Sequence, residues 1–166
     1  QKIYRARMHT ISYMPISEKL KERYISFPGS VFKQYFQSMG QIIGDVSAGT
    51  LQRAGSDFGK KAAVSLRREN RKAKLEESLK IIEELGLGKI RLAEDVIYLE
   101  DSFEANAIGK SPVPVCNLTS GIIHGLCMGM GLNYVYYEEK CTAQGNNTCV
   151  FKKRELKWYE RVQAVI

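Results

Sequence analysis

Three cysteines and a glutamate in the last third of the chain constrain its fold more than any other feature. Glu138 and Cys141 lie three positions apart, and Cys116 and Cys149 flank them on either side. Thiolates are soft anionic donors suited to zinc, and a carboxylate can complete a tetrahedron where three sulfurs converge. The pattern is typical of a metal clamp that ties this part of the chain together.

The spacing alone leaves alternatives open, because the paired Cys-x-x-Cys units of zinc ribbons and fingers are missing. The cysteines could be buried reduced thiols, or Cys141 and Cys149 could form a disulfide. Cys116 is expected at a helix N-terminus, which lowers the pKa of a thiol and would predispose Cys116 to ionise. Cys127 lies within a glycine-rich helical pattern and is expected to be a small buried hydrophobic residue.

Length and composition indicate one globular domain. The chain has 166 residues, of which 44% are hydrophobic and 26% are charged. Neither a run long enough to cross a membrane nor the apolar core of a signal peptide occurs, so we expect a cytoplasmic protein without membrane insertion. The net charge of +7 is densest between Lys60 and Lys74. No aromatics are interleaved there, so we predict a solvated helix face and no nucleic-acid partner.

The hydrophobic pattern predicts an extended N-terminal arm over residues 1–29, followed by alternating helical and extended segments. The helical pattern from Ser30 to Val64 is too long for one straight helix. The predicted segments are a short strand at 11–14, helices at 30–64, 75–85, 117–130 and 153–166, a strand pair at 90–92 and 97–103 with a turn at Glu94–Asp95, and a hairpin from 134–138 and 149–152.

Small residues recur at about every fourth position along the first helical region. They leave one side of the helix or helices nearly bare, so that another backbone can approach closely. Tight helix packing within the fold is the favoured interpretation, and a pocket wall or a subunit seam are the alternatives. The residues are Gly40, Gly44, Ala48, Gly55, Gly59, Ala62 and Ala63.

The C-terminal motif resembles the 4-vinyl reductase domain family. The resemblance rests on Cys116-Asn117-Leu118-Thr119-Ser120-Gly121, Gly125, the run from Glu138 to Gly145, and Cys149-Val150-Phe151, and covers about residues 86–152. It implies an α+β fold in which helices pack on one face of an antiparallel β-sheet with a zinc-clamped C-terminal hairpin. Residues 30–166 would form this single domain.

The resemblance also implies a ligand set. By residue-wise correspondence with the sensor members of the family, Cys116, Glu138, Cys141 and Cys149 would hold zinc. Glu139 is the alternative carboxylate, but Glu138 has the matching offset from Cys141. Four protein ligands without water would make the site closed, and the zinc structural.

A mostly apolar cavity between helices and sheet is a further family property. The histidine and tryptophan that address phenol in the phenol sensors have no match here, because His9 and Trp158 stand elsewhere and His124 is expected to be structural. A larger or wholly apolar ligand therefore fits better than phenol. The predicted lining is Gly44, Ala48, Gly55, Phe58, Gly59, Phe103, Ile122 and Met130.

We therefore expect a zinc-containing sensor or carrier domain for a small hydrophobic molecule. It is expected to be a homodimer, with the bare glycine face around Gly44 as the candidate seam. A tetrapyrrole vinyl reductase or its accessory protein is one alternative, although no dinucleotide fingerprint or Ser/His/Asp arrangement supports catalysis. An assembly or scaffold protein is the second alternative.

Overall fold

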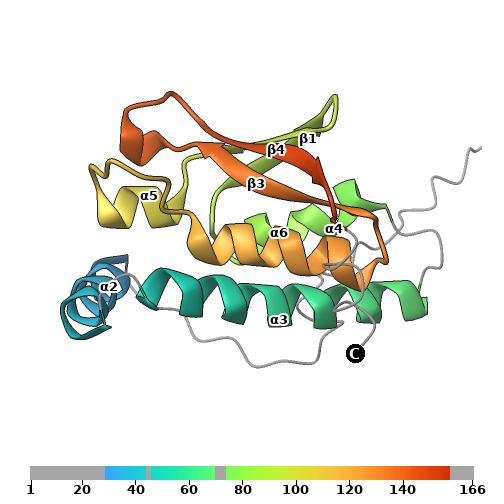
Figure 1. Ribbon diagram of the computed structural model, residues 1–166, viewed down its shortest axis with the longest axis horizontal. Coiled ribbons are helices and arrows are strands. Elements are labelled where there is room, and N and C mark those ends of the chain that lie inside the picture. The colour runs from blue at the N-terminus through green and yellow to red at the C-terminus, as the bar shows by residue number, and fades with distance from the viewer. Residues whose placement is uncertain (1–28, 44–45, 70–73, 158–166) are drawn as a thin grey trace, which may run out of the picture.

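The computed structural model describes residues 29–43, 46–69 and 74–157 (Figure 1). The predicted strand at 11–14, Gly44 and the end of the predicted C-terminal helix lie outside these residues. The elements in chain order are α2 (Gly29–Ile43), α3 (Val46–Glu69), α4 (Leu75–Glu84), β1 (Lys89–Ala93), β2 (Val96–Glu100), α5 (Phe103–Ile108), α6 (Asn117–Gly129), β3 (Tyr134–Lys140), the 3₁₀ turn η1 (Thr142–Gln144) and β4 (Cys149–Glu155).

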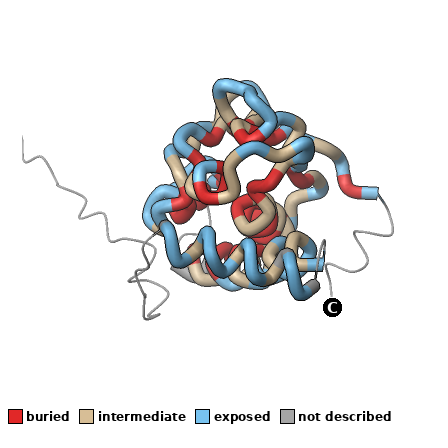
Figure 2. The backbone as a smooth tube through the Cα atoms, turned by 90° about the vertical axis from the view of Figure 1, so that its left-hand side faces the viewer, coloured by how far each residue is buried: buried red, intermediate tan, exposed pale blue. Residues whose placement is uncertain are grey.

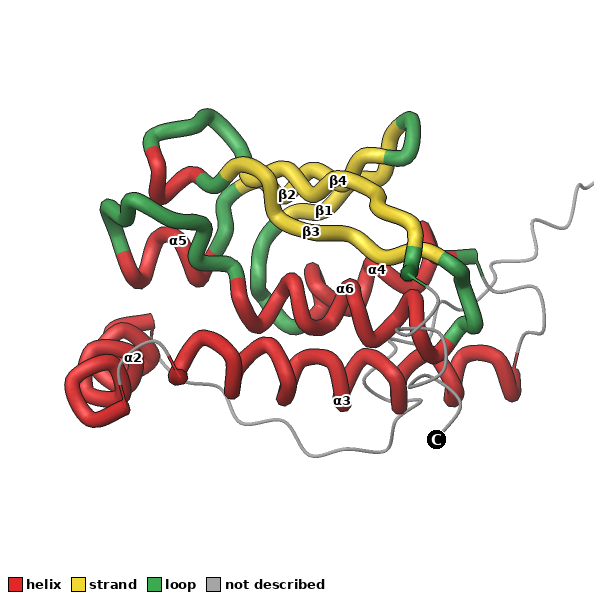
Figure 3. The backbone as a smooth tube through the Cα atoms, viewed as in Figure 1, coloured by secondary structure: helices red, strands yellow, loops and turns green. Residues whose placement is uncertain are grey.

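The four described strands form one antiparallel sheet in the order β1-β2-β4-β3. The helices gather on one side of this sheet (Figure 3), so the predicted α+β class is confirmed. The β1–β2 turn is at Glu94 and Asp95, as predicted, and both residues have positive φ. Two positive φ values give the turn a twist that matches the twist of the paired strands.

Helix α6 lies between the sheet and α3, so it is covered on two sides (Figure 1). The buried residues gather in the same central part of the molecule (Figure 2). Ile123 and Leu126 of α6 are fully buried, as are Leu99 and Phe151 of the sheet. A helix enclosed in this way needs large apolar side chains on one face and small residues on the face that approaches its other neighbour closely. This explains the many glycines of α6.

Glycines bring the backbones of α3 and α6 into direct contact. A Cβ added at Gly55 or Gly59 of α3 would collide with the α6 backbone. Gly121 and Gly125 of α6 have the same relation to the α3 backbone. The favoured interpretation of the small-residue pattern, tight helix packing within the fold, is therefore confirmed for these positions.

The structure corrects two predicted boundaries. The second predicted strand ends at Glu100 rather than at Phe103, because Ser102 caps the unpredicted helix α5 by accepting the N–H of Ala105. Strand β4 continues to Glu155, so Lys153 begins no helix. Among the described residues, no helix combines the length and the apolar character that crossing a membrane requires.

Candidate metal centre

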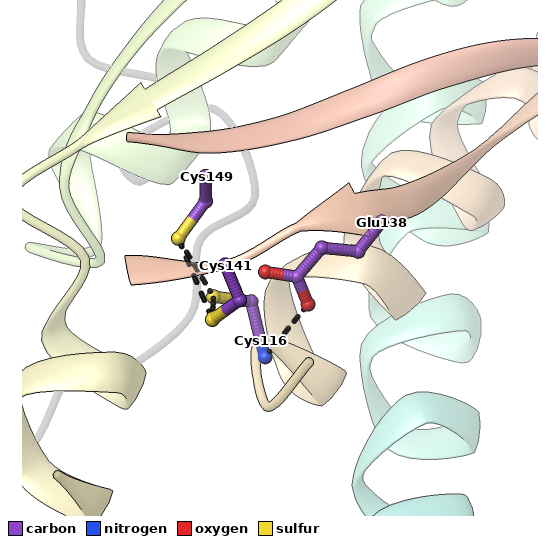
Figure 4. A group of neighbouring side chains, drawn as sticks. All are labelled: Cys116, Glu138, Cys141 and Cys149. Carbon is purple, nitrogen blue, oxygen red and sulfur yellow. Dashed lines mark hydrogen bonds between the residues drawn. The ribbon is translucent and has the colours of Figure 1, made fainter. Parts of the chain in front are cut away.

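The structure brings the four predicted metal ligands together at one end of the sheet (Figure 4). One ligand atom from each of Cys116, Glu138, Cys141 and Cys149 lies within 4.8 Å of the others. Cys116, Cys141 and Cys149 are fully buried. These donors therefore form a cluster that could hold a metal ion.

Each ligand is positioned by the end or an irregularity of an element. Cys116 is the N-cap of α6, Cys141 directly follows β3, and Cys149 opens β4. The register of the β3–β4 pairing shifts between Glu138 and Lys140, as in a β-bulge. Bulges re-aim side chains, and here Glu138 faces the three cysteines.

The sulfur atoms are spaced as zinc requires. The Sγ atom of Cys116 is 3.5 Å from that of Cys149 and 3.8 Å from that of Cys141, and the remaining pair is 3.7 Å apart. A tetrahedral zinc with bonds of about 2.3 Å to sulfur separates its sulfurs by about 3.8 Å. All three cysteines are free, so the alternative of a Cys141–Cys149 disulfide is wrong for this structure.

One carboxylate oxygen of Glu138 has no hydrogen-bond partner among the described residues. Its Oε2 accepts the backbone N–H of Cys116 at 3.0 Å, whereas its Oε1 is buried without a hydrogen-bond partner among the described residues. A buried polar atom without a partner costs roughly 1–3 kcal/mol. A metal ion bound by Oε1 would remove this cost, so the donor set fits a cation.

The electrostatics of the cluster correct the expectation for Cys116. The neighbouring sulfurs of Cys141 and Cys149, burial and the charge of Glu138 all raise the pKa of Cys116. Cys149 instead has a lowered pKa, because its sulfur forms hydrogen bonds with Cys116 and Cys141 and accepts the N–H of Thr142. Burial raises the pKa of Glu138 to about 8. Without a cation the cluster therefore resists carrying four negative charges.

Two further side chains contact the sulfurs. Ser102 Oγ lies 3.2 Å from Cys116 Sγ, and Thr142 places its backbone N and its Oγ1 at 3.3 and 3.5 Å from Cys149 Sγ. Sequence reasoning missed both residues. Thr142 adjoins a predicted ligand, which is a signal that could have been used, but nothing in the sequence connects Ser102 with Cys116.

The alternative carboxylate and the fourth cysteine lie outside the cluster. Glu139 points to Lys152, with which it forms an ion pair of 2.7 Å. Cys127 is fully buried in α6, and burial raises its pKa to about 12. Cys127 is thus the small buried residue that was predicted.

The predicted pocket residues are dispersed over several elements. Gly55 and Gly59 face the α6 backbone, and Ile122 is buried in the core. Phe103 is partly buried, with its ring 4.7 Å from that of Phe32. Of the others, Ala48 is half-buried and Phe58 and Met130 pack against the core.

Open hollows lie at other places on the described surface. One, of about 690 Å³, is bounded by α5 and η1 next to the cysteine cluster. A second, of about 540 Å³, lies between α3 and α6, and is lined by His124 together with Arg53 and Lys60. Neither hollow was predicted from the sequence.

Comparison with protein families finds one match, in the C-terminal part of the chain. Residues 95–155, which contain all four clustered ligands, match the model of the 4-vinyl reductase domain. This match agrees with the resemblance that the sequence motif indicated. Comparison with curated proteins found no match.

Solved structures show where the same fold occurs. The phenol-responsive sensory domain of the transcription activator PoxR, solved with phenol, has 18% sequence identity and a TM-score of 0.68 over 87% of this chain and 83% of that chain. A vinyl-4-reductase family protein from Methanocaldococcus jannaschii has 22% identity and a TM-score of 0.58, over 86% and 91%. A trafficking protein particle complex subunit 3 from Naegleria fowleri, covalently bound to palmitic acid, has 11% identity and a TM-score of 0.50, over 78% and 95%.

Proposed function

We propose that this protein is a zinc-containing domain that binds a small hydrophobic molecule as a sensor or carrier. The observation that carries the zinc assignment is the cluster of three sulfurs 3.5 to 3.8 Å apart beside an unpartnered buried carboxylate oxygen. The match to the 4-vinyl reductase domain and the phenol-bound PoxR domain of the same fold support the binding function.

Zinc at this site is structural. Cys116, Glu138, Cys141 and Cys149 would hold it, and four protein ligands leave no open position for water. When bound, the ion neutralises the thiolates and links the start of α6 to the end of β3 and the start of β4. Because metal binding is coupled to folding, the ion would stabilise this end of the sheet.

The ligand is small and apolar, and its binding site lies among the helices. Phe103 of α5 and Phe58 of α3 are partly buried apolar side chains from the predicted lining, and Phe32 of α2 extends that lining through its contact with Phe103. Aromatic and apolar side chains are the usual lining of small-molecule sites. Phe103→Ala is expected to weaken ligand binding, whereas Val113→Ala, at an exposed apolar residue, serves as the control.

The domain acts as a homodimer, and α2 is the candidate contact surface. Val31, Tyr35 and Ile42 lie at helical spacing on α2 and are 48%, 53% and 76% exposed. Exposed apolar stripes of this kind are typical of interaction surfaces. A cytoplasmic location accords with three clustered cysteines that remain reduced.

Native mass spectrometry of freshly purified protein tests these proposals together. We expect a dimer with one zinc per chain and an additional small organic mass. A metal-free monomer that retains no organic mass and does not respond to apolar compounds in a titration would contradict the proposal. Zinc-free protein that carries a flavin or a tetrapyrrole would support the alternative of a vinyl reductase.

A further inference from the structure

Glu104, on the short helix α5, is a carboxylate enclosed completely by the protein. It is 0% exposed, and no cation is paired with it among the described residues. A buried acidic side chain without a counter-ion is costly unless hydrogen bonds compensate. Glu104 is not among the clustered metal ligands, so its burial needs a separate reason.

The hydrogen bonds of Glu104 all go to the first turn of α6. Its Oε1 accepts the backbone N–H of Leu118 at 2.8 Å, and its Oε2 accepts the N–H of Thr119 at 2.9 Å and the hydroxyl of Thr119 at 2.7 Å. All three partners of the carboxylate are hydrogen-bond donors. The N-terminal end of α6, which is the positive end of the helix dipole, also favours the negative charge of Glu104. Burial raises the pKa of Glu104, and these hydrogen bonds oppose the rise.

These N–H groups are the ones that an N-cap side chain ordinarily accepts. The N-cap of α6 is Cys116, whose side chain makes no capping hydrogen bond, because its sulfur faces Cys141 and Cys149. Glu104 therefore supplies the cap from another helix. The backbone N–H of Cys116 itself is accepted by Glu138.

The same segment also touches the Cys116 sulfur. Ser102 Oγ accepts the N–H of Ala105 and lies 3.2 Å from Cys116 Sγ, so its hydroxyl proton is available to the sulfur. Helix α5 thus holds both the backbone that follows Cys116 and the Cys116 side chain. Neither contact was signalled by the sequence.

We propose that Glu104 is a positioning residue of the metal centre: it caps α6 in place of Cys116 and so leaves the Cys116 sulfur free to bind the metal. This inference rests on the proposed zinc site. In the Glu104→Gln variant the amide can present one acceptor, but its NH₂ group would face a backbone N–H of α6. The first turn of α6 would then shift, and Cys116 with it.

The test compares zinc affinity, measured by competition with a chromophoric chelator, in the wild type, Glu104→Gln and Glu100→Gln. Glu100 is an exposed glutamate at the end of β2, four residues before Glu104 in the sequence, and serves as the matched control. Loss of an outer partner of a metal ligand typically weakens binding by about 10- to 100-fold. We expect about tenfold weaker zinc binding for Glu104→Gln, with one zinc still bound per chain, and unchanged binding for Glu100→Gln.

A second measurement separates positioning from general stability. Cobalt substituted for zinc gives charge-transfer absorption from each bound thiolate, and we expect Glu104→Gln to lower or shift this band while circular dichroism shows a folded protein. Wild-type affinity and an unchanged cobalt spectrum in Glu104→Gln would overturn the inference. If that variant does not fold, Thr119→Val decides in the same way, because it removes one of the three hydrogen bonds to Glu104. A wild-type protein that takes up no zinc would instead refute the proposed metal site.

Discussion

The contact between α3 and α6 yields a prediction that can be worked from the structure, the substitution Gly125→Ala. A Cβ at this position would lie inside contact distance of the Ser56 carbonyl oxygen and 2.9 Å from the backbone nitrogen of Lys60. Both neighbours are backbone atoms of α3, so no side-chain rotation can make room. The two helices would have to separate.

The expected loss of stability is about 2 kcal/mol. A separation on the order of 1 Å forfeits roughly a quarter to a half of the dispersion energy of each atom pair across the contact. Overpacking of this kind costs about 1–3 kcal/mol or more, and replacing glycine by alanine within a helix returns up to about 1 kcal/mol. The steric cost therefore exceeds the gain in helix propensity.

Urea unfolding measures this difference, with Gly49→Ala as the matched control. Gly49 lies in α3 and has no atom within 4 Å of an added Cβ, so alanine there should stabilise the protein by about 0.5–1 kcal/mol. The two variants carry the same chemical change and should differ by about 3 kcal/mol in opposite directions. Equal stabilisation by both substitutions would refute the close approach of the two helices.

Three predictions concern the metal centre. Cys149→Ser should lose the metal, as elemental analysis would show. At free zinc about 1,000-fold above the dissociation constant, the loss should lower the free energy of unfolding by about 4 kcal/mol. Cys127→Ser, at an equally buried cysteine, should keep the metal. For metal-free protein, the raised pKa of Glu138 contributes stability that is lost as pH rises from about 4.5 through 8. The unfolding free energy of the wild type minus that of Glu138→Gln should therefore decrease between pH 5 and pH 8, because the opposite effect of Cys149 is common to both proteins; an increase would contradict the raised pKa. Glu139→Gln breaks an ion pair with the exposed Lys152, so it should change stability by less than about 1 kcal/mol and leave zinc binding intact; loss of metal would reassign the carboxylate ligand.

Much of the fold could be predicted from the sequence because its local signals agree with the tertiary structure. The apolar period from Leu75 to Leu85 predicted α4, and Gly86, with φ of +71°, follows the helix where the sequence placed its end. The turn at Glu94 and Asp95 was also predicted from the sequence and is present in the structure. In these cases the residues that form the element also determine its ends.

Helix α5 was missed because its signal is short and conflicts with its neighbours. The run into Phe103 continues the apolar pattern of β2, and six residues are too few for a helical period to stand out. Strand β4 was shortened for a related reason. Its last residues, through Glu155, are mostly exposed and charged, so pairing with β3 rather than residue type makes them a strand.

For the proposed metal site, spacing and family resemblance predicted the four side chains that the structure brings together, but not the residues that contact them. Cys116 and Glu138 could be named from the sequence because thiols and carboxylates in such a motif imply metal chemistry. Ser102 and Glu104 reach the site through hydrogen bonds to the start of α6, which are contacts between separate segments that no local pattern reports. The raised pKa of Cys116 could not be predicted for the same reason, since the neighbouring sulfurs of Cys141 and Cys149 lie far along the sequence.

The proposed function depends above all on a zinc ion held by Cys116, Glu138, Cys141 and Cys149. X-ray absorption spectroscopy at the zinc edge of the purified protein tests it most directly, because the fine structure reports the number and type of ligands. We expect three sulfurs at about 2.3 Å and one oxygen at about 2.0–2.2 Å. Protein without stoichiometric zinc, or zinc surrounded only by nitrogen and oxygen, would contradict it.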